Sequence, residues 1–265
     1  TNTGGNSTAV GYQALKANTT GGSEAFGYQA LGANTTGASN NAFGLLTLSA
    51  NTTGSYNTAF GQQALIANTT ASANTAVGYQ AGYSNTTGGY NTFHGMQSGF
   101  SNTTGINNTN IGYAANFSNS TGNYNVSVGY QSLNSNTASY NTAVGYQAGY
   151  GNTGGAVTFI GFQSGYSNTG ADNIALGADS FYSNTSGSSN TAIGRSALRS
   201  NTTASYGTAV GYQAAYSNTA ANGITAIGYR AGYSYATPAL TENWLSTFVG
   251  YQACLLYTSP SPRDV

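Results

Sequence analysis

The side chains that could carry acid–base or metal chemistry are few and scattered. His94 is the only histidine, and the acidic residues are Glu24, Asp172, Asp179, Glu242 and Asp264. A general base needs partners within hydrogen-bond reach, and Asp172 and Asp179 lie half a repeat apart. We therefore predict no catalytic residue, no metal site and no cofactor, and we expect His94 to be a packing residue at a strand position.

Charge and hydropathy also exclude several classes of partner. Only 4% of the residues are charged, and the formal net charge is zero. Arg195, Arg199 and Arg230 could form a sparse basic patch, but a solvated face is the better interpretation. No apolar run approaches the roughly 18 residues of a membrane span. We expect no enzyme, no nucleic-acid partner and no direct membrane insertion by this segment.

A repeated unit dominates the chain. The stretch AVGYQALKANTTG from Ala9 is followed sixteen residues later by AFGYQALGANTTG. Successive anchor glycines are separated by 16 or 17 residues, except for a final spacing of 22. The fifteen anchors are Gly11, Gly27, Gly44, Gly61, Gly78, Gly95, Gly112, Gly129, Gly145, Gly161, Gly177, Gly194, Gly211, Gly228 and Gly250.

Positions within one unit are counted from the anchor glycine, which is position 0. The core T-A-V-G-Y-Q-A is typical of a β-strand. A bulky residue stands at −1 in all copies but that of His94, and a small residue stands at +3. Because side chains on a strand alternate, we expect −1, +1 and +3 to share a bulky face, and Ala at −2, the glycine and Gln at +2 to share a small, uncharged face.

An asparagine at +7 opens the turn N-T-T-G in the first thirteen copies. We predict that these side chains stack into a ladder along one edge: Asn18, Asn34, Asn51, Asn68, Asn85, Asn102, Asn119, Asn136, Asn152, Asn168, Asn184, Asn201 and Asn218.

Position +4 also follows a pattern. A Leu there is never followed by an aromatic residue, whereas a Gly there always is. We therefore expect one corner of the interior to be filled by one large group that arrives from either position.

The repeat length predicts an all-β fold. Sixteen or seventeen residues suit one coil of a parallel β-solenoid or β-roll, with about fifteen coils stacked at the spacing of hydrogen-bonded strands. Few large side chains are available for each coil. We therefore expect a homotrimer in which the face of Ala, Gly and Gln approaches other chains.

The motif N-T-A-V-G-Y-Q-A resembles the repeat of the YadA-like head of trimeric autotransporter adhesins, and the resemblance runs fifteen times to Ala253. Similar arrays occur in phage tail fibres. The resemblance implies a left-handed, trimeric β-roll at the end of a fibre, which binds a host surface protein or glycan. It implies an extracellular location, at the cell surface of an outer-membrane-anchored protein or on a virion tail fibre.

Two regions depart from the repeat. Residues 1–253 are interpreted as the repetitive domain of a longer chain, and residues 254–265, which begin CLLYTSPSPRD, as the translation of a sequencing adapter. The long final spacing predicts a contact loop that carries Pro238, Glu242 and Trp244.

Three alternatives to an adhesin remain open. The first is a phage tail-fibre segment. The second is an ice-binding solenoid, because Thr recurs at −3 in Thr58, Thr75, Thr92, Thr142 and Thr191. The third is a glycosylated filament, because N-x-S/T sequons occur at Asn18, Asn34, Asn51, Asn68, Asn85, Asn102, Asn184 and Asn201. The tyrosines at +1 are expected to stack, with carbohydrate binding as their secondary role.

Overall fold

The computed structural model describes residues 5–235 and 245–255. These residues contain short β-strands, turns and bends but no helix. They form two compact units, Thr1–Asn141 and Thr142–Val265. Each unit is a parallel β-solenoid with coils of about 17 residues, which confirms the predicted fold class.

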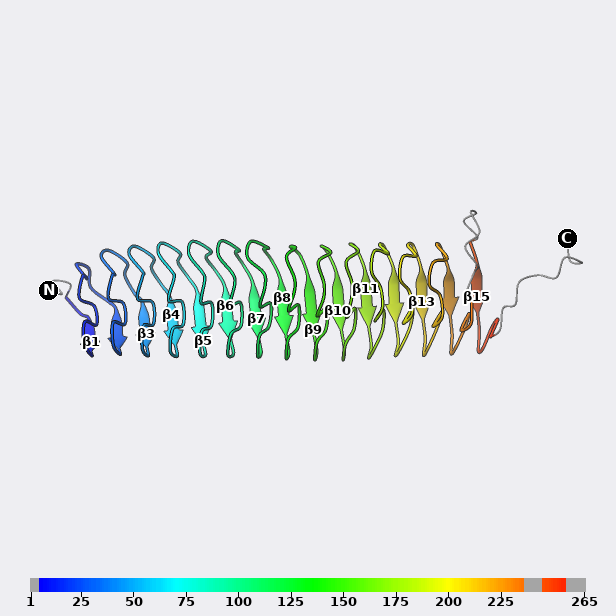
Figure 1. Cartoon of the computed structure of the whole chain (residues 1–265), viewed down its shortest axis with the longest axis horizontal. Helices are drawn as coiled ribbons and strands as arrows, with labels where there is room; N and C mark the ends of the chain where they lie inside the picture. The colour runs from blue at the N-terminus through cyan, green and yellow to red at the C-terminus, as the bar shows by residue number, and fades with distance from the viewer. Residues whose placement is uncertain (1–4, 236–244, 256–265) are drawn as a thin grey trace, which may run out of the picture. The chain divides into compact units, whose positions relative to one another are not determined.

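Every strand is three residues long and occupies positions −3 to −1. In the first unit the strands are β1 (Thr8–Val10), β2 (Glu24–Phe26), β3 (Asn41–Phe43), β4 (Thr58–Phe60), β5 (Thr75–Val77), β6 (Thr92–His94), β7 (Thr109–Ile111) and β8 (Val126–Val128). Consecutive strands pair in parallel and place like positions side by side, as in Ala42↔Ala59 (Figure 1).

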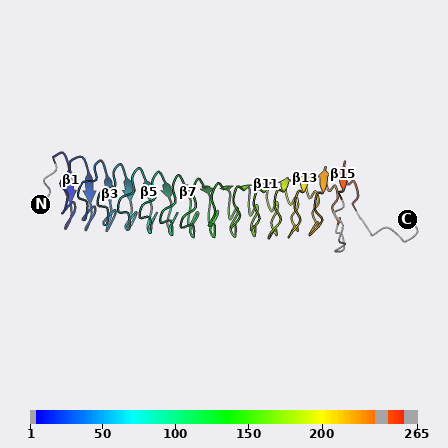
Figure 2. The ribbon, with the colours of Figure 1, turned by 90° about the horizontal axis from the view of Figure 1, so that it is seen from above.

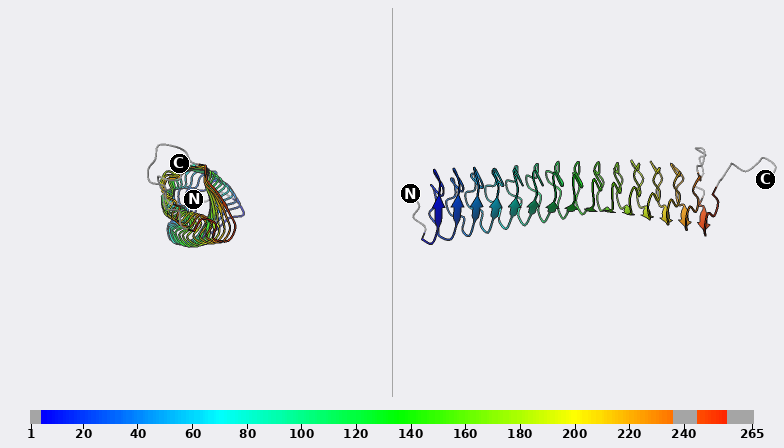
Figure 3. Two further views of the ribbon diagram at one scale, coloured as in Figure 1. Left: turned by 90° about the vertical axis from the view of Figure 1, so that its right-hand side faces the viewer. Right: turned by 90° about the horizontal axis from the view of Figure 1, so that it is seen from below.

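The second unit repeats this arrangement. Its strands are β9 (Thr142–Val144), β10 (Thr158–Ile160), β11 (Ile174–Leu176), β12 (Thr191–Ile193), β13 (Thr208–Val210), β14 (Thr225–Ile227) and β15 (Thr247–Val249). The strands of each unit lie on one side of its coils, as the views in Figures 2 and 3 show.

The anchor glycines form the corner at which each strand ends. Gly61 has φ +123°, and a Cβ atom on it would lie 2.6 Å from the carbonyl oxygen of Gly78 in the next coil. Its amide donates a hydrogen bond to the Phe43 carbonyl of the preceding coil at 2.8 Å. The corner therefore needs both the left-handed backbone and the absent side chain of glycine.

The two faces of the strand are reversed relative to the sequence-based expectation. Ala25, Ala42, Ala59 and Ala76 at −2 are completely buried inside the coil, while the bulky residue at −1 points outward. The strand stops at the glycine, and Gln63 at +2 and Leu65 at +4 are also left-handed. Strict alternation therefore does not continue into the turn, and positions +3 and +4 both point inward.

Buried asparagines fill much of the interior. The thirteen residues at +7 are at most 1% exposed, so the ladder runs through the core and not along an edge. Asn51 Nδ2 donates to Asn34 Oδ1 of the preceding coil at 2.7 Å and to the Gly54 carbonyl of its own turn at 2.9 Å. Such an amide joins two coils and closes a turn. The ladder is interrupted at Asn102, whose Oδ1 atom has no hydrogen-bond partner.

From the sequence, the aromatic residue at +5 was expected to fill the interior where +4 is Gly, and this expectation is wrong. The aromatic side chain at +5 lies in a surface stack, and the space beside a Gly at +4 is filled by a phenylalanine at −2. A Cβ on Gly82 would lie 2.6 Å from the Phe93 ring, and one on Gly165 would lie 2.6 Å from the Phe159 ring. Large and small side chains do compensate for each other in volume, but the two positions involved are −2 and +4, which meet in the interior of the coil.

One coil of the first unit breaks the pattern. Asn110 replaces Ala at −2 and Asn116 replaces Leu at +4, and both are completely buried. Neither polar atom of the Asn110 amide has a hydrogen-bond partner, nor does Asn116 Nδ2. Buried polar groups without partners cost about 1–3 kcal/mol each, so this coil is the weakest described part of the core.

We predict that the double substitution Asn110→Ala/Asn116→Leu raises stability by about 1–3 kcal/mol, because it removes unpaired polar atoms and introduces the Ala and Leu found at −2 and +4 in other coils, such as that of Ala59 and Leu65. Urea unfolding of the full chain measures the change. Asn125→Ala is the control and should be destabilising, because Asn125 Nδ2 donates to the Ala138 carbonyl at 3.0 Å and Asn125 Oδ1 accepts from the backbone N–H of Asn141 at 3.0 Å. A double variant less stable than wild type would contradict this interpretation of the core.

Candidate functional site

The residues considered for catalysis do not converge. Glu24 lies in β2, His94 is exposed at the end of β6, and Asp172 and Asp179 stand in a turn and at a +2 position. Within the described ranges, no three His, Cys, Asp or Glu side chains are close enough to hold a metal ion. Two predicted sets fall outside those ranges: the loop residues Pro238, Glu242 and Trp244, and Asp264. Residues 5–235 and 245–255 contain no helix that is long and apolar enough to cross a membrane.

The first repeated surface is the strand stripe, which we define as the outward residues at −3 and −1 of each strand. Large apolar side chains on it are open to solvent in the single chain. Val10 is 54% exposed, and the other exposed apolar residues at −1 are Phe60, Ile111, Ile160, Leu176, Ile227 and Val249. The Phe26, Phe43 and Phe60 rings stack at centroid distances of 4.7 and 4.4 Å. The stripe is therefore a column of uncovered apolar groups on a parallel sheet.

The second repeated surface is the aromatic–glutamine face, formed by positions +1, +2 and +5. Rings at +1 stack on one another, as in Tyr212–Tyr229–Tyr251. Glutamines at +2 form an amide ladder, in which Gln29 Nε2 donates to Gln13 Oε1 at 2.8 Å. Rings at +5 form a second stack in both units: Tyr83–Phe100–Phe117, Tyr150–Tyr166–Tyr182 and Tyr216–Tyr233.

The stacking of these rings decides how they can bind a ligand. The centroids within each pair are about 5 Å apart and the planes are nearly parallel, as for Tyr166 and Tyr182 (5.0 Å, 8°). Each ring in the middle of a stack therefore has both faces covered by its neighbours, and only its edge and hydroxyl reach solvent. This geometry disfavours the secondary role suggested for the tyrosines, in which a sugar ring would stack on a tyrosine face.

Arginines replace residues of this face in the second unit. The Arg199 guanidinium lies between the Tyr182 and Tyr216 rings, 5.0 and 5.9 Å from their centroids. Arg230 lies over Tyr229 and Tyr233 at 5.4 and 5.1 Å. Arg230 Nε donates to Gln213 Oε1 at 2.8 Å. Two of the three predicted patch residues are therefore held by aromatic rings, and Arg195 is exposed at +1 of the coil that contains Arg199.

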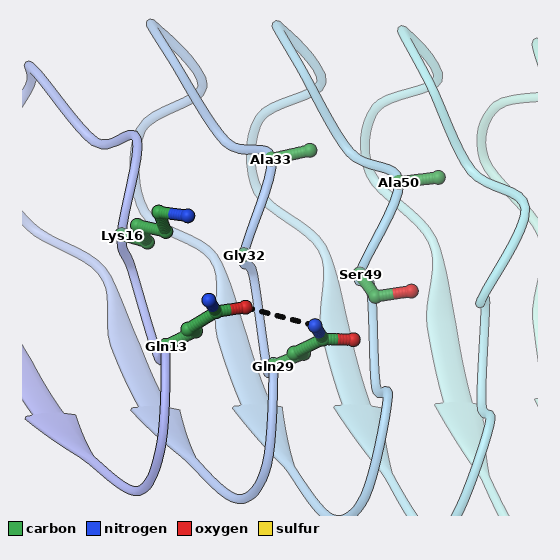
Figure 4. Close-up of a pocket in the computed structure, with 7 residues that line it drawn as sticks. All are labelled: Gln13, Lys16, Gln29, Gly32, Ala33, Ser49 and Ala50. Carbon is green, nitrogen blue, oxygen red and sulfur yellow. Dashed lines mark hydrogen bonds between the residues drawn. The ribbon is translucent and has the colours of Figure 1, made fainter.

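A shallow pocket opens where the +5 column of the first unit lacks large side chains. It has a volume of about 330 Å³ and is lined by Gln13, Lys16, Gln29, Gly32, Ala33, Ser49 and Ala50 (Figure 4). Its polar groups are amides, one ammonium and one hydroxyl, which provide hydrogen bonds but no nucleophile–base pair. The pocket is therefore a gap in the aromatic–glutamine face.

Eight N-x-S/T sequons of the +7 ladder have no room for a glycan in the folded coil. Their asparagines are buried, and their Nδ2 atoms donate to carbonyl oxygens of the turn, as Asn85 does to Gly88 at 2.9 Å. A glycan would have to be attached to that same nitrogen. These eight sequons are therefore a consequence of the structural repeat, whereas Asn6 and Asn107, which also begin N-x-S/T sequences, are exposed.

A second asparagine ladder was missed by the sequence analysis. It occupies −4, immediately before the strand, at Asn40, Asn57, Asn74, Asn91, Asn108, Asn125, Asn141, Asn173 and Asn190. The backbone N–H of Asn57 donates to Asn40 Oδ1 at 2.9 Å, and the side-chain Nδ2 of Asn57 donates to the Ala71 carbonyl at 2.9 Å. The recurring Asn-Thr before the strand was the available signal.

Comparison of the chain with protein-family models, with curated proteins and with solved structures gives no match. The function is therefore inferred from the geometry of the strand stripe and the aromatic–glutamine face.

The stack at +5 predicts a pH dependence. Burial raises the pKa of Tyr166, and the neighbouring Tyr182 and Tyr150 raise it further. A raised pKa stabilises the fold below the ordinary tyrosine pKa of about 10, and this contribution is lost as the pH rises through the folded pKa. Tyr166→Phe should therefore reduce the alkaline loss of stability, and the column already accepts Phe100 and Phe117.

Thermal unfolding at about pH 9 and about pH 11 measures this difference. The matched control is Tyr206→Phe, which removes one hydroxyl group from an exposed ring outside the column. If Tyr166→Phe and wild type lost equal stability between the two pH values, the tyrosine stack at +5 would not be the cause of the alkaline sensitivity.

Proposed function

We propose that this chain is a non-enzymatic segment of an extracellular fibre that mediates adhesion, and that it acts as a homotrimer of parallel rolls. The observation that supports the trimer is the strand stripe. Its apolar side chains recur in the coils of both units, except in the coil of Thr92 and His94, and the single chain leaves them exposed or partly exposed. Continuous exposed apolar surface is typical of an interface between protein chains.

The trimer interface proposed here differs from the surface expected from the sequence. The small Ala column at −2 is inside each coil and is not available to another chain. The outward column at −1 supplies Val, Ile, Leu and Phe instead, and burying such side chains contributes about 1.5–3 kcal/mol each. Three parallel copies bring the same column of each chain to one axis, so a threefold arrangement covers all three stripes at once.

The solenoid architecture and the repeat resemblance both support an adhesive fibre. The described coils present long columns of repeated polar and aromatic groups, as a surface for multivalent contact would, and they present no convergent catalytic set. An autotransporter head and a phage tail-fibre segment are the two settings proposed for it, in each case with a left-handed roll and a host surface protein or glycan as the ligand.

We predict that the full chain has a mass in solution of three times 26.8 kDa, measured by light scattering after size exclusion. Ile111→Lys/Ile227→Lys, which places charges on the strand stripe of both units, should lower the mass to that of one chain. Tyr90→Lys/Tyr206→Lys adds the same charge at exposed rings outside the stripe and should leave the trimer intact. A monomeric wild type, or a trimeric Ile111→Lys/Ile227→Lys variant, would exclude this interface.

Ice binding is a second candidate because the structure places the threonines at −3 on the outward side of the strands. Thr75 is exposed, and Thr58, Thr92, Thr142 and Thr191 are partly exposed. These residues share the strand stripe, so a trimer that covers it leaves no array for ice. We therefore predict no gap between the melting and freezing temperatures of a solution of the chain. A gap that the Ile111→Lys/Ile227→Lys variant abolishes would favour ice binding instead.

A further inference from the structure

The strongest concentration of charge among the described residues lies on the aromatic–glutamine face of the second unit. Three of the four described cations, Arg195, Arg199 and Arg230, occur within three consecutive coils there. None of the three has an ion-pair partner among the described residues. Asp179 is the one carboxylate in these +1, +2 and +5 columns of the unit, in the coil before Arg195.

The tyrosine stacks hold two of these guanidinium groups in place. Arg199 continues the +5 column between the Tyr182 and Tyr216 rings, and Tyr216 stacks on Tyr233 at 5.1 Å. Tyr233 in turn lies under Arg230. A guanidinium that lies against a ring keeps its N–H edges available to an anion, and its planar donors match a carboxylate. The two cations are therefore ordered before any ligand binds.

The spacing of these cations suits a polymer that runs along the coils. Arg199 and Arg230 are two coils apart, which corresponds to a separation of about 10 Å along the coils at the spacing of paired strands, and they stand in different columns, +5 and +2. This separation along the coils is close to the length of one disaccharide. Between them lie Gln213 and the tyrosine ring edges, which can hydrogen-bond to sugar hydroxyls without requiring an exposed ring face.

We propose that this Arg–Tyr cluster binds an acidic polysaccharide that carries about one carboxylate per disaccharide, with successive carboxylates at Arg199 and Arg230 and with Arg195 adding to the local positive charge. This proposal rests on the proposed adhesive function and names the class of glycan. Nucleic acid fits less well, because duplex DNA carries one negative charge per about 1.7 Å of its axis, and three cations neutralise only a small part of that charge.

The chain itself supplies a neutral variant of the cluster. Arg195→Tyr and Arg199→Tyr introduce the residue that the next coil has in the same column, Tyr212 and Tyr216, and Arg230→Gln introduces the residue found at Gln213. The triple variant therefore removes the positive charge while keeping the residue types that stack and form ladders. Lys16→Gln removes the fourth described cation, which lies in the first unit, and is the matched control.

The experiment measures the affinity of the immobilised full chain for a hyaluronan oligosaccharide, for dextran of similar length and for single-stranded DNA, at low and at physiological salt. We expect hyaluronan to bind more tightly than dextran and DNA. The triple variant should lose about tenfold or more of that affinity, since charge-assisted hydrogen bonds are removed. Lys16→Gln should leave it unchanged.

Any of three results would overturn the proposal. They are equal affinity of wild type and triple variant for hyaluronan, tighter Arg-dependent binding of DNA, and hyaluronan binding no stronger than dextran binding. The mass of the chain in solution separates this failure from failure of the proposed fibre. A trimer that does not bind hyaluronan removes only the ligand assignment, whereas a monomer with Arg-dependent hyaluronan binding retains the ligand assignment and removes the trimer.

Discussion

The structure depends on the stacking of buried amides from one coil to the next. An asparagine amide inside a protein has two N–H donors and one oxygen acceptor, and each of them that is left without a hydrogen bond lowers the free energy of unfolding. In the ladder at +7, Asn68 Nδ2 donates to Asn51 Oδ1 at 2.8 Å and to the Ala71 carbonyl at 3.1 Å, while Asn85 donates to Asn68 Oδ1 at 2.9 Å. The amide is satisfied because its neighbours are amides at the same height, so the sequence has to repeat.

The same constraint shapes the surface. Coils that must match inside also match outside, so apolar side chains, aromatic rings and glutamine amides each form a continuous column. Each coil therefore differs from its neighbours at only a few positions, and single replacements such as Arg199 and Arg230 give a local character to an otherwise uniform face.

Much of this fold is predictable from the sequence, because the period and the anchor glycine reflect backbone geometry directly. The spacing gave the coil length, and T-A-V before the glycine gave the strands. The side-chain directions were not predictable in this way. Alternation applies to a strand, but these strands end after three residues, and Gln63 and Leu65 adopt left-handed backbone that no simple pattern indicates. The inside of the coil was therefore assigned to the wrong column, and the Ala column that was expected to face other chains lies inside the coil.

The candidate surfaces were also predictable from the sequence only in part. The tyrosine stacks and the presence of three nearby arginines were readable from residue types and spacing. That Arg199 lies between two rings, and that Phe93 fills the space beside Gly82, depends on contacts across the coil and between coils. Such contacts follow from the path of the turn, which sequence periodicity does not specify.

An experimental structure of the purified full chain is the most direct test of the central claim, that the outward apolar column of the strands is an interface between copies. We predict a threefold axis along which Ile111 and Ile227 of one chain lie in van der Waals contact with the same residues of its two partners. A structure in which these side chains face solvent, or in which the chains meet through the aromatic–glutamine face, would contradict it.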